Sequence, residues 1–192
     1  MARRTAPAPQ TRREALLRAA ADLFAERGFH GVGVDDIGAA AGISGPGVYR
    51  HFASKDAMLA EMLVGISEEL LREGSRRVAD EPDPGRALDA LVRWHVEFAL
   101  SNPALITVHD RDLGNLPEAD HRRVRRLQRL YVEEWVAVIR RVAPPTGEAE
   151  ARATAHALFG LINSTPHSAA GLSRADMAEL LHRMAIAAVS RR

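Results

Sequence analysis

Apolar residues recur every three or four positions along most of the chain, which is the period of an amphipathic helix. The first such stretch has apolar residues at Leu16, Leu17, Ala20, Leu23 and Phe24. Thr11 stands before it with Glu14 three places on, the pattern of a capping box, and Gly28 is suited to a helix C-terminus. We therefore predict a first helix between Thr11 and Gly28.

Two short helical segments follow, at residues 34–41 and 45–52, and a longer one spans about 54–78. A proline- and glycine-rich break at 81–85 ends this part of the pattern. Beyond the break, helical periodicity returns at residues 85–100, 103–113, 117–142, 147–165 and 174–190. Since no segment alternates with period two, we predict an all-α fold of about nine helices.

Composition narrows the class of protein. The chain is 46% hydrophobic and 27% charged with a net charge of +1, as in an ordinary soluble protein. It lacks cysteine, a membrane-length apolar run and an apolar stretch after its first arginines, so we expect a cytoplasmic protein without disulfides. Residues 1–10 have two arginines and no apolar period, which predicts a flexible basic arm.

The two short segments outline a helix-turn-helix, because a glycine-containing turn at residues 41–44 joins them. Gly42 can take a positive φ there, and Ile37 and Val48 are expected to hold the two helices together. The residues predicted to contact DNA are Ser44, Gly45, Pro46, Tyr49, Arg50, His51 and Lys55, with Lys55 placed to meet a phosphate. The alternative is that Tyr49 and Phe52 are core residues and that Arg50 and His51 are solvated.

This stretch resembles the TetR family of bacterial regulators over roughly residues 11–60. The matching segments are Phe24, Gly28-Phe29, Val34-Asp35-Asp36-Ile37, Ala41-Gly42-Ile43-Ser44, Val48-Tyr49-Arg50-His51-Phe52 and Ser54-Lys55-Asp56. The resemblance implies a homodimer on a palindromic operator in double-stranded DNA, released when an effector enters the C-terminal part. It divides the chain into the arm (1–10), a three-helix DNA-binding head (11–56) and an effector-binding and dimerisation domain (57–192).

The chain departs from the family pattern in its glycines. The family often has Thr or Ser where Gly33 stands, and Thr or Ala where Gly47 stands. The run Gly45-Pro46-Gly47 also removes side chains that would otherwise contact bases or phosphates. We therefore expect base contacts to depend on Tyr49, Arg50 and His51, with Arg3 and Arg4 of the arm as further candidates.

The C-terminal helices are rich in small residues, which lets helices approach closely. Examples are Ala151, Ala155, Ala157, Gly160, Ala178, Ala185 and Ala188. One chain cannot bury the apolar stripes on both faces of these helices. We therefore expect a two-fold four-helix dimer interface. The alternative is that these residues pack only within one chain.

An effector pocket is predicted where the rarer side chains gather, between the long linker helix and the dimer helices. Its predicted residues are Trp94, Phe98, His109, Tyr131, Trp135 and Asn163. Under the resemblance, the central helices enclose a cavity, and an apolar pocket with a few polar groups is the default ligand site. The alternative for any one aromatic residue is plain core packing.

Residues 109–117 and the arginine-rich helix after them resemble a TetR subgroup tied to lipid and acyl-CoA metabolism. An apolar cavity beside Arg122, Arg123, Arg126 or Arg129 would suit an acyl chain with a phosphate-bearing head group. This makes an acyl-CoA-like effector one hypothesis. The alternative is that these arginines form a solvated helix face.

The alternatives to an effector-controlled regulator are an enzyme and a DNA-binding dimer without an effector. The sequence has no Gly-x-Ser-x-Gly elbow, His-Glu-x-x-His motif, phosphate loop or dinucleotide fingerprint, and its histidines lack metal-ligand spacing. We therefore expect no enzyme activity, no cofactor, no metal and no membrane partner. A second alternative keeps the DNA-binding dimer but removes the effector, leaving control by abundance or by a protein partner.

Overall fold

The structure is a computed structural model that describes residues 11–144, 146–168 and 171–190. Every regular element in these ranges is helical: α1 (Arg12–Arg27), α2 (Val34–Ala40), α3 (Gly45–Val48), α4 (Lys55–Asp80), α5 (Pro84–Ser101), α6 (Pro103–Asp112), the 3-10 turn η1 (Leu113–Asn115), α7 (Glu118–Val142), α8 (Glu148–Ile162), α9 (Thr165–Ser168) and α10 (Arg174–Ser190). The all-α prediction is confirmed. The elements not predicted, η1 and α9, are too short to leave a periodic pattern.

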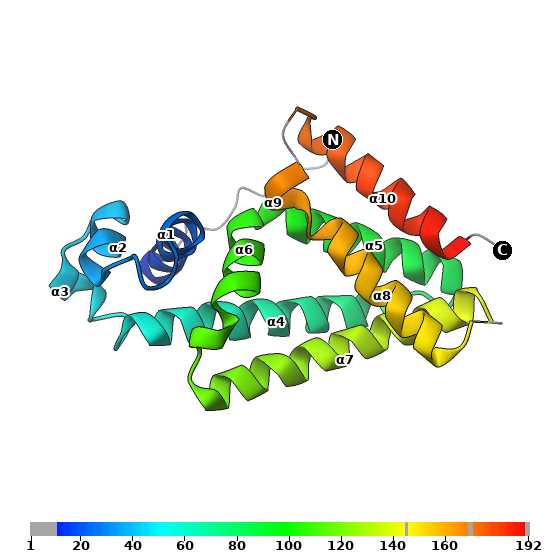
Figure 1. Ribbon diagram of the computed structural model, residues 1–192, viewed down its shortest axis with the longest axis horizontal. Helices are drawn as coiled ribbons and strands as arrows, with labels where there is room; N and C mark the ends of the chain where they lie inside the picture. Colours follow the sequence, from blue (N-terminus) through cyan, green and yellow to red (C-terminus); the bar gives the residue numbers. More distant parts are fainter. Residues whose placement is uncertain (1–10, 145, 169–170, 191–192) are drawn as a thin grey trace.

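Helices α1–α3 form a head at one end of the molecule, and the long helix α4 runs from the head into the body (Figure 1). In the body, α4 and α7 lie side by side and α5 packs against both, while α8 packs on α7 and α10 packs on α5 and α8. Helix α6 stands between the two parts, packed against α1. Helices α4 and α6 are therefore the elements that join the head to the body.

The helix ends follow the capping residues that the sequence contains. Thr11 and Glu14 form the predicted capping box, with Thr11 N to Glu14 Oε2 at 2.9 Å and Glu14 N to Thr11 Oγ1 at 3.2 Å. Gly28 ends α1 with a φ of 81°, and its N–H donates to the carbonyl of Phe24. Ser54 caps α4 through the N–H of Ala57 at 3.1 Å.

Two clusters of buried apolar side chains make up the core. One contains the head, the first half of α4 and parts of α5, α6 and α7; the other fills the body around Trp135. Met58 and Leu63 of α4 are fully buried in the first cluster. The predicted domain boundary between residues 56 and 57 thus falls in the first turn of α4, a helix that packs in both parts.

The predicted arm at residues 1–10, with Arg3 and Arg4, lies outside the described residues. Among the helices that the structure does describe, none combines the length and the apolar character needed to cross a bilayer.

Candidate DNA interface and ligand cavity

The helix-turn-helix is built around two buried side chains and two glycines. Ile37 of α2 and Val48 of α3 are 0% and 1% exposed, which confirms the prediction that they hold these helices together. Gly42 has a φ of 70° in the turn between them. At Gly38, an added Cβ would lie 2.9 Å from the carbonyl oxygen of Ile43, so only glycine lets the turn pack this closely on α2.

Helix α3 is shorter than predicted, spanning Gly45–Val48 instead of 45–52. Glycine and proline have the lowest helix propensities, and they fill three of its four positions. Tyr49, Arg50 and His51 follow as hydrogen-bonded turns, in which the N–H of Phe52 donates to the carbonyl of Val48 at 3.1 Å. The predicted DNA-contacting side chains therefore stand mostly on a turn at the end of α3.

The predicted DNA-contacting residues differ in exposure. Tyr49 is 58% exposed, Ser44, Pro46 and Arg50 are also exposed, and His51 is half-buried. Phe52 is 3% exposed and belongs to the core, as its alternative interpretation held. Exposed side chains, with Tyr49 the largest apolar one, are thus available to a partner at α3 and the turn after it.

Gly45 was predicted to face DNA, and this is wrong. The residue is buried, and a Cβ added there would lie 1.9 Å from Oδ1 of Asp35. Because Gly45 has no side chain, it instead lets α3 pack closely against α2. Ser44 stands at the N-cap position of α3 without a side-chain hydrogen bond to the helix.

Lys55 has a structural role that the sequence analysis missed. Its Nζ donates to the carbonyl oxygens of Phe29 at 2.7 Å and Val32 at 2.8 Å, and it lies 4.3 Å from the centre of the Phe29 ring. The ammonium group has three N–H donors, and two are used inside the head. Only the third N–H remains available to donate to a DNA phosphate.

Arg13 links three parts of the head. It donates to the carbonyl of His51, pairs with Glu61 of α4 through Nε at 2.8 Å, and lies 4.1 Å from the centre of the Phe52 ring. These contacts fix the turn after α3 relative to α1 and α4.

The body contains a cavity of about 250 Å³ between α4, α5, α6, α7 and α8. Its apolar wall includes Ile66, Leu70, Phe98, Ile106, Val132 and Phe159. Four of the six predicted pocket residues line it: Phe98, His109, Tyr131 and Asn163. Trp94 and Trp135 do not, so those two predictions are wrong: Trp135 is fully buried behind the cavity, and Trp94 packs under the guanidinium of Arg77 at 4.4 Å.

His95, absent from the predicted pocket residues, is the centre of a buried polar network. Its Nδ1 lies 3.2 Å from Oη of Tyr131, and its Nε2 lies 3.1 Å from Oδ1 of Asn163. Burial lowers the pKa of His95 to about 4, although the hydrogen bond with Asn163 opposes this shift. The ring is therefore neutral at pH 7. Its position three residues before Phe98, on the same helix face, was the available sequence signal.

Tyr131 owes its position to a glycine on α4. A Cβ added to Gly74 would lie 2.6 Å from Cε2 of the Tyr131 ring. Burial raises the pKa of the Tyr131 hydroxyl well above its usual value, so this group stays protonated. Tyr131 can thus act as a hydrogen-bond donor inside the cavity.

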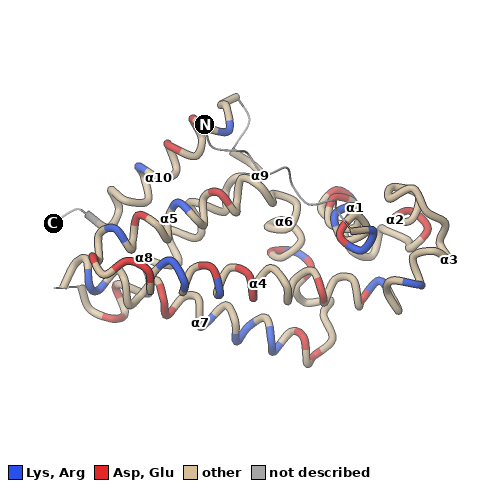
Figure 2. Tube along the Cα trace, turned by 180° about the vertical axis from the view of Figure 1, so that it is seen from behind, with Lys and Arg blue, Asp and Glu red and all other residues tan. Residues whose placement is uncertain are grey.

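The arginine-rich stretch of α7 lies outside the cavity. Arg122 pairs with Glu118 at 2.8 Å, Arg123 pairs with Glu68 of α4 at 2.5 Å, and Arg126 and Arg129 are exposed. Basic and acidic residues both occur along the long helices of the body (Figure 2). The geometry therefore favours the solvated-face interpretation of these arginines.

Helix α6 connects the cavity wall to the head. Its side chain Arg111 donates to the carbonyl oxygens of Phe24 and Ala25 at the end of α1, and pairs with the buried Asp112 at 3.1 Å. Asn115 adds a second link, because its Oδ1 lies 2.9 Å from Nε2 of His30 in the loop after α1. The same helix contributes Leu105, Ile106, His109 and Asp110 to the cavity.

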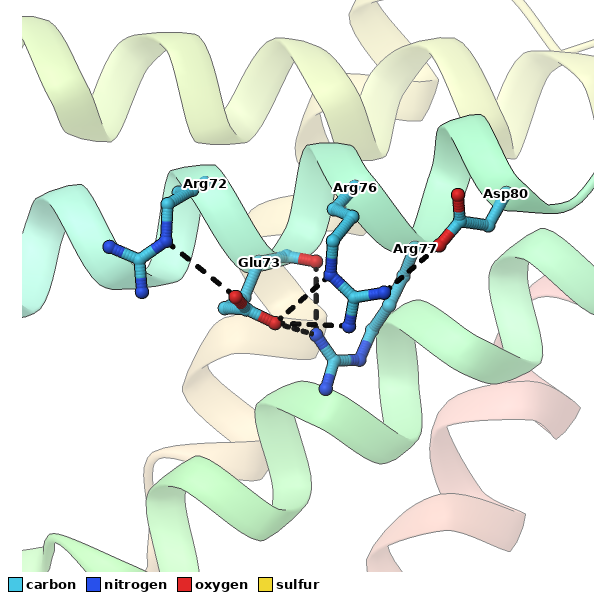
Figure 3. Close-up of polar contacts among 5 residues, drawn as sticks. All are labelled: Arg72, Glu73, Arg76, Arg77 and Asp80. Carbon is cyan, nitrogen blue, oxygen red and sulfur yellow. Dashed lines mark hydrogen bonds and ion pairs between the residues drawn. The ribbon is translucent and has the colours of Figure 1, made fainter.

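A charge cluster lies along the second half of α4 (Figure 3). Glu73 accepts from Arg77 at 2.6 Å and Arg76 at 3.1 Å, and its other oxygen lies 3.6 Å from Arg72; Arg76 also pairs with Asp80 at 2.9 Å. Hydrogen bonds from Arg77 and Arg76 hold the pKa of Glu73 below its usual value. Exposed pairs stabilise little singly, but Arg77 also packs on Trp94 and so ties α4 to α5.

Helices α8 and α10 leave a face of small and apolar residues uncovered. On α8, Ala149, Ala153, Ala157 and Gly160 are exposed at helical spacing. Leu172 and Met184, the latter on α10, are 47% and 46% exposed.

The chain matches two family models: bacterial regulatory proteins of the tetR family over residues 16–62, and the tetracyclin repressor-like C-terminal domain over residues 81–189. The HTH-type transcriptional repressor KstR2 of Rhodococcus jostii is 36% identical over 105 residues, which are 55% of this chain and 52% of that protein. The HTH-type transcriptional activator FasR of Mycolicibacterium smegmatis is 33% identical over 87 residues, 45% of this chain and 40% of FasR. The matched region thus spans about half of these relatives, or less.

Solved structures share the fold along nearly the whole chain. The ketosteroid transcriptional regulator KstR2 of Mycobacterium tuberculosis superposes with a TM-score of 0.82 at 21% identity, covering 98% of this chain and 100% of that one. The structure of AibR in complex with isovaleryl coenzyme A and operator DNA superposes with a TM-score of 0.74 at 19% identity. The match covers 91% of this chain and 97% of that one. The relatives are regulators, in line with the expectation that the chain is not an enzyme. The chain belongs to the TetR family of bacterial regulatory proteins.

Proposed function

We propose that this chain is a transcriptional repressor that binds a palindromic operator as a homodimer and leaves it when a small effector enters the body. The observation that carries the proposal is a helix-turn-helix with an intact packed core and an outer surface of exposed Tyr49, Arg50 and Pro46. Its place in the TetR family and its similarity to the repressor KstR2 support the same function. Such a protein works in the cytoplasm.

A dimer is supported by two independent arguments. One four-residue recognition helix contacts too few bases to be specific alone, so two heads are needed on two half-sites. The uncovered face of α8 and α10 offers a surface for the second copy, with small residues that permit close helix packing.

An effector is supported by the cavity and its link to the head. The cavity is mainly apolar and has a few polar groups, which is typical of small-molecule sites. AibR, a structural neighbour, was solved with isovaleryl coenzyme A, which keeps an acyl-CoA among the effector classes. Since the α7 arginines lie outside the cavity, an acyl-CoA would place only its acyl end inside.

The proposal is tested by selecting genomic fragments with the purified protein at physiological salt and sequencing what remains bound. We expect enrichment of one or a few palindromes. Featureless recovery, with binding that vanishes as salt rises, would show only non-specific electrostatic affinity and would contradict the proposal.

A DNA-binding dimer without an effector is the second candidate, controlled by abundance or by a protein partner. The two are separated by thermal unfolding with and without ligand. A ligand that binds the folded state raises its stability by RT ln(1 + [L]/Kd), whereas a protein without an effector site gains nothing.

A further inference from the structure

The polar groups that line the cavity are unbalanced in charge. Among the described residues that line it there is no lysine and no arginine, and Asp110 contributes a carboxylate. The remaining polar groups are uncharged hydroxyls and amides and the imidazoles of His95, His109 and His156. Burying an anion without a cation to pair with it is costly, so the wall disfavours carboxylates and phosphates.

Asn163 presents a free donor within this wall. Its Oδ1 accepts from Nε2 of His95 at 3.1 Å, which fixes the orientation of the amide. With its proton on Nε2, the neutral ring accepts from the hydroxyl of Tyr131 at Nδ1. Both His95 nitrogens are thus used, while Nδ2 of Asn163 has no partner among the described residues.

We infer that the cavity binds a compact, uncharged, mainly apolar group, either a whole molecule or the acyl end of a larger one, whose carbonyl oxygen accepts a hydrogen bond from Nδ2 of Asn163. This rests on the proposed function only in identifying the molecule as the effector. His95 and Tyr131 act as positioning residues, because they hold the Asn163 amide without spending its donor.

The size of the cavity limits the ligand further. An apolar cavity of roughly 150 Å³ holds benzene, so about 250 Å³ has room for somewhat more than one ring. That is room for a ring or a short acyl chain, not for a nucleotide. The carbonyl therefore belongs either to a free ketone or ester, or to an acyl thioester whose nucleotide stays outside.

The test uses four probes that share a phenyl ring: acetophenone, ethylbenzene, benzoate and benzoyl-CoA. Dissociation constants are measured by NMR titration of the full chain. Acetophenone and ethylbenzene are both expected to bind, and benzoate to bind much more weakly than either. Benzoyl-CoA binding more tightly than acetophenone would assign the carbonyl to a thioester, and the reverse order would assign it to a free carbonyl compound; both support the inference.

The hydrogen bond is isolated by substitution. In Asn163→Leu we expect acetophenone to bind about 2- to 10-fold more weakly, as for loss of one neutral hydrogen bond, with ethylbenzene unchanged. Ser164→Ala, at a neighbouring residue outside the cavity wall, is the control and should change neither. If Asn163→Leu does not fold, Asn163→Asp keeps the side-chain shape, removes the donor and should also weaken only acetophenone.

The inference is overturned if acetophenone and ethylbenzene lose affinity equally in the Asn163 variants, if benzoate binds as tightly as acetophenone, or if neither neutral probe binds. None of these measurements uses DNA. A failure here leaves operator binding untouched, and a chain that binds the ketone but selects no palindrome fails the proposed function alone.

Discussion

Arg111 of α6 donates a hydrogen bond to the carbonyl oxygen of Phe24 in the last turn of α1. One helix thus lines the cavity with Ile106 and His109 and also holds the end of a head helix. A ligand that displaces α6 has a direct route to the recognition surface, provided that it binds the DNA-incompetent state more tightly.

Replacing Arg111 with Met keeps an unbranched side chain but removes the bonds to α1, together with the ion pair to the buried Asp112. We expect ligand binding to persist, while the effect of the ligand on operator affinity falls from the usual coupling of about 5- to 150-fold toward none. The measurement is operator affinity with and without a saturating ligand.

Arg122→Met is the matched control for this variant, because Arg122 pairs only with Glu118 on the exposed face of α7. It should leave the coupling intact. Unchanged coupling in Arg111→Met would show that the link between α6 and α1 does not transmit the signal.

The buried His95 makes stability depend on pH. Burial lowers its pKa to about 4 from an ordinary value of 6.5, so between these values the unfolded chain binds more protons than the folded one. The contribution is fully present above pH 6.5 and is lost as pH falls toward 4. At about 1.4 kcal/mol per pKa unit, the loss is about 3 kcal/mol.

Urea unfolding at several pH values checks this expectation. His95→Gln should unfold with a flatter pH dependence than the wild type between pH 6.5 and 4. His167→Gln, at an exposed histidine of α9, should follow the wild-type curve. Parallel curves for the wild type and His95→Gln would contradict the account of His95.

Gly38 and Gly47 allow a paired test of the helix-turn-helix. In Gly38→Ala the new methyl group meets the backbone oxygen of Ile43 at 2.9 Å, so we expect a loss of about 1–3 kcal/mol in unfolding free energy. In Gly47→Ala the nearest atoms lie at an ordinary 3.5 Å, and a helical alanine should be neutral or stabilising by up to about 1 kcal/mol. Equal losses in both variants would contradict this packing argument.

Tyr49 is the test of base contact, because at 58% it is the most exposed large hydrophobic side chain among the described residues, and it directly follows α3. Tyr49→Ala should weaken operator binding by about 1–3 kcal/mol, the range for one good base contact, and leave binding to random DNA nearly unchanged. Equal losses on both kinds of DNA would remove Tyr49 from base recognition.

The head could be predicted from the sequence because its signals are local. The capping box at Thr11, the turn at Gly42 and the apolar pair Ile37 and Val48 each depend on a few neighbouring residues. The error at Gly45 and the structural role missed at Lys55 both come from contacts with residues 10 and 26 positions away, Asp35 and Phe29, which no local pattern contains.

The cavity was predicted less completely, since its wall comes from five helices. Composition located the aromatic residues, but spacing along one helix could not separate Tyr131, which lines the cavity, from Trp135, which packs behind it. The Arg111 link was not predicted either, because it joins residues 87 positions apart.

The most direct test of the account compares the enriched palindrome with a duplex in which one half-site is scrambled, at physiological salt. We expect two chains per palindrome and an affinity at least about 10³-fold tighter than for random DNA, with most of that advantage lost on the scrambled duplex. Equal affinity for both duplexes, or one chain per palindrome, would contradict specific dimeric operator binding.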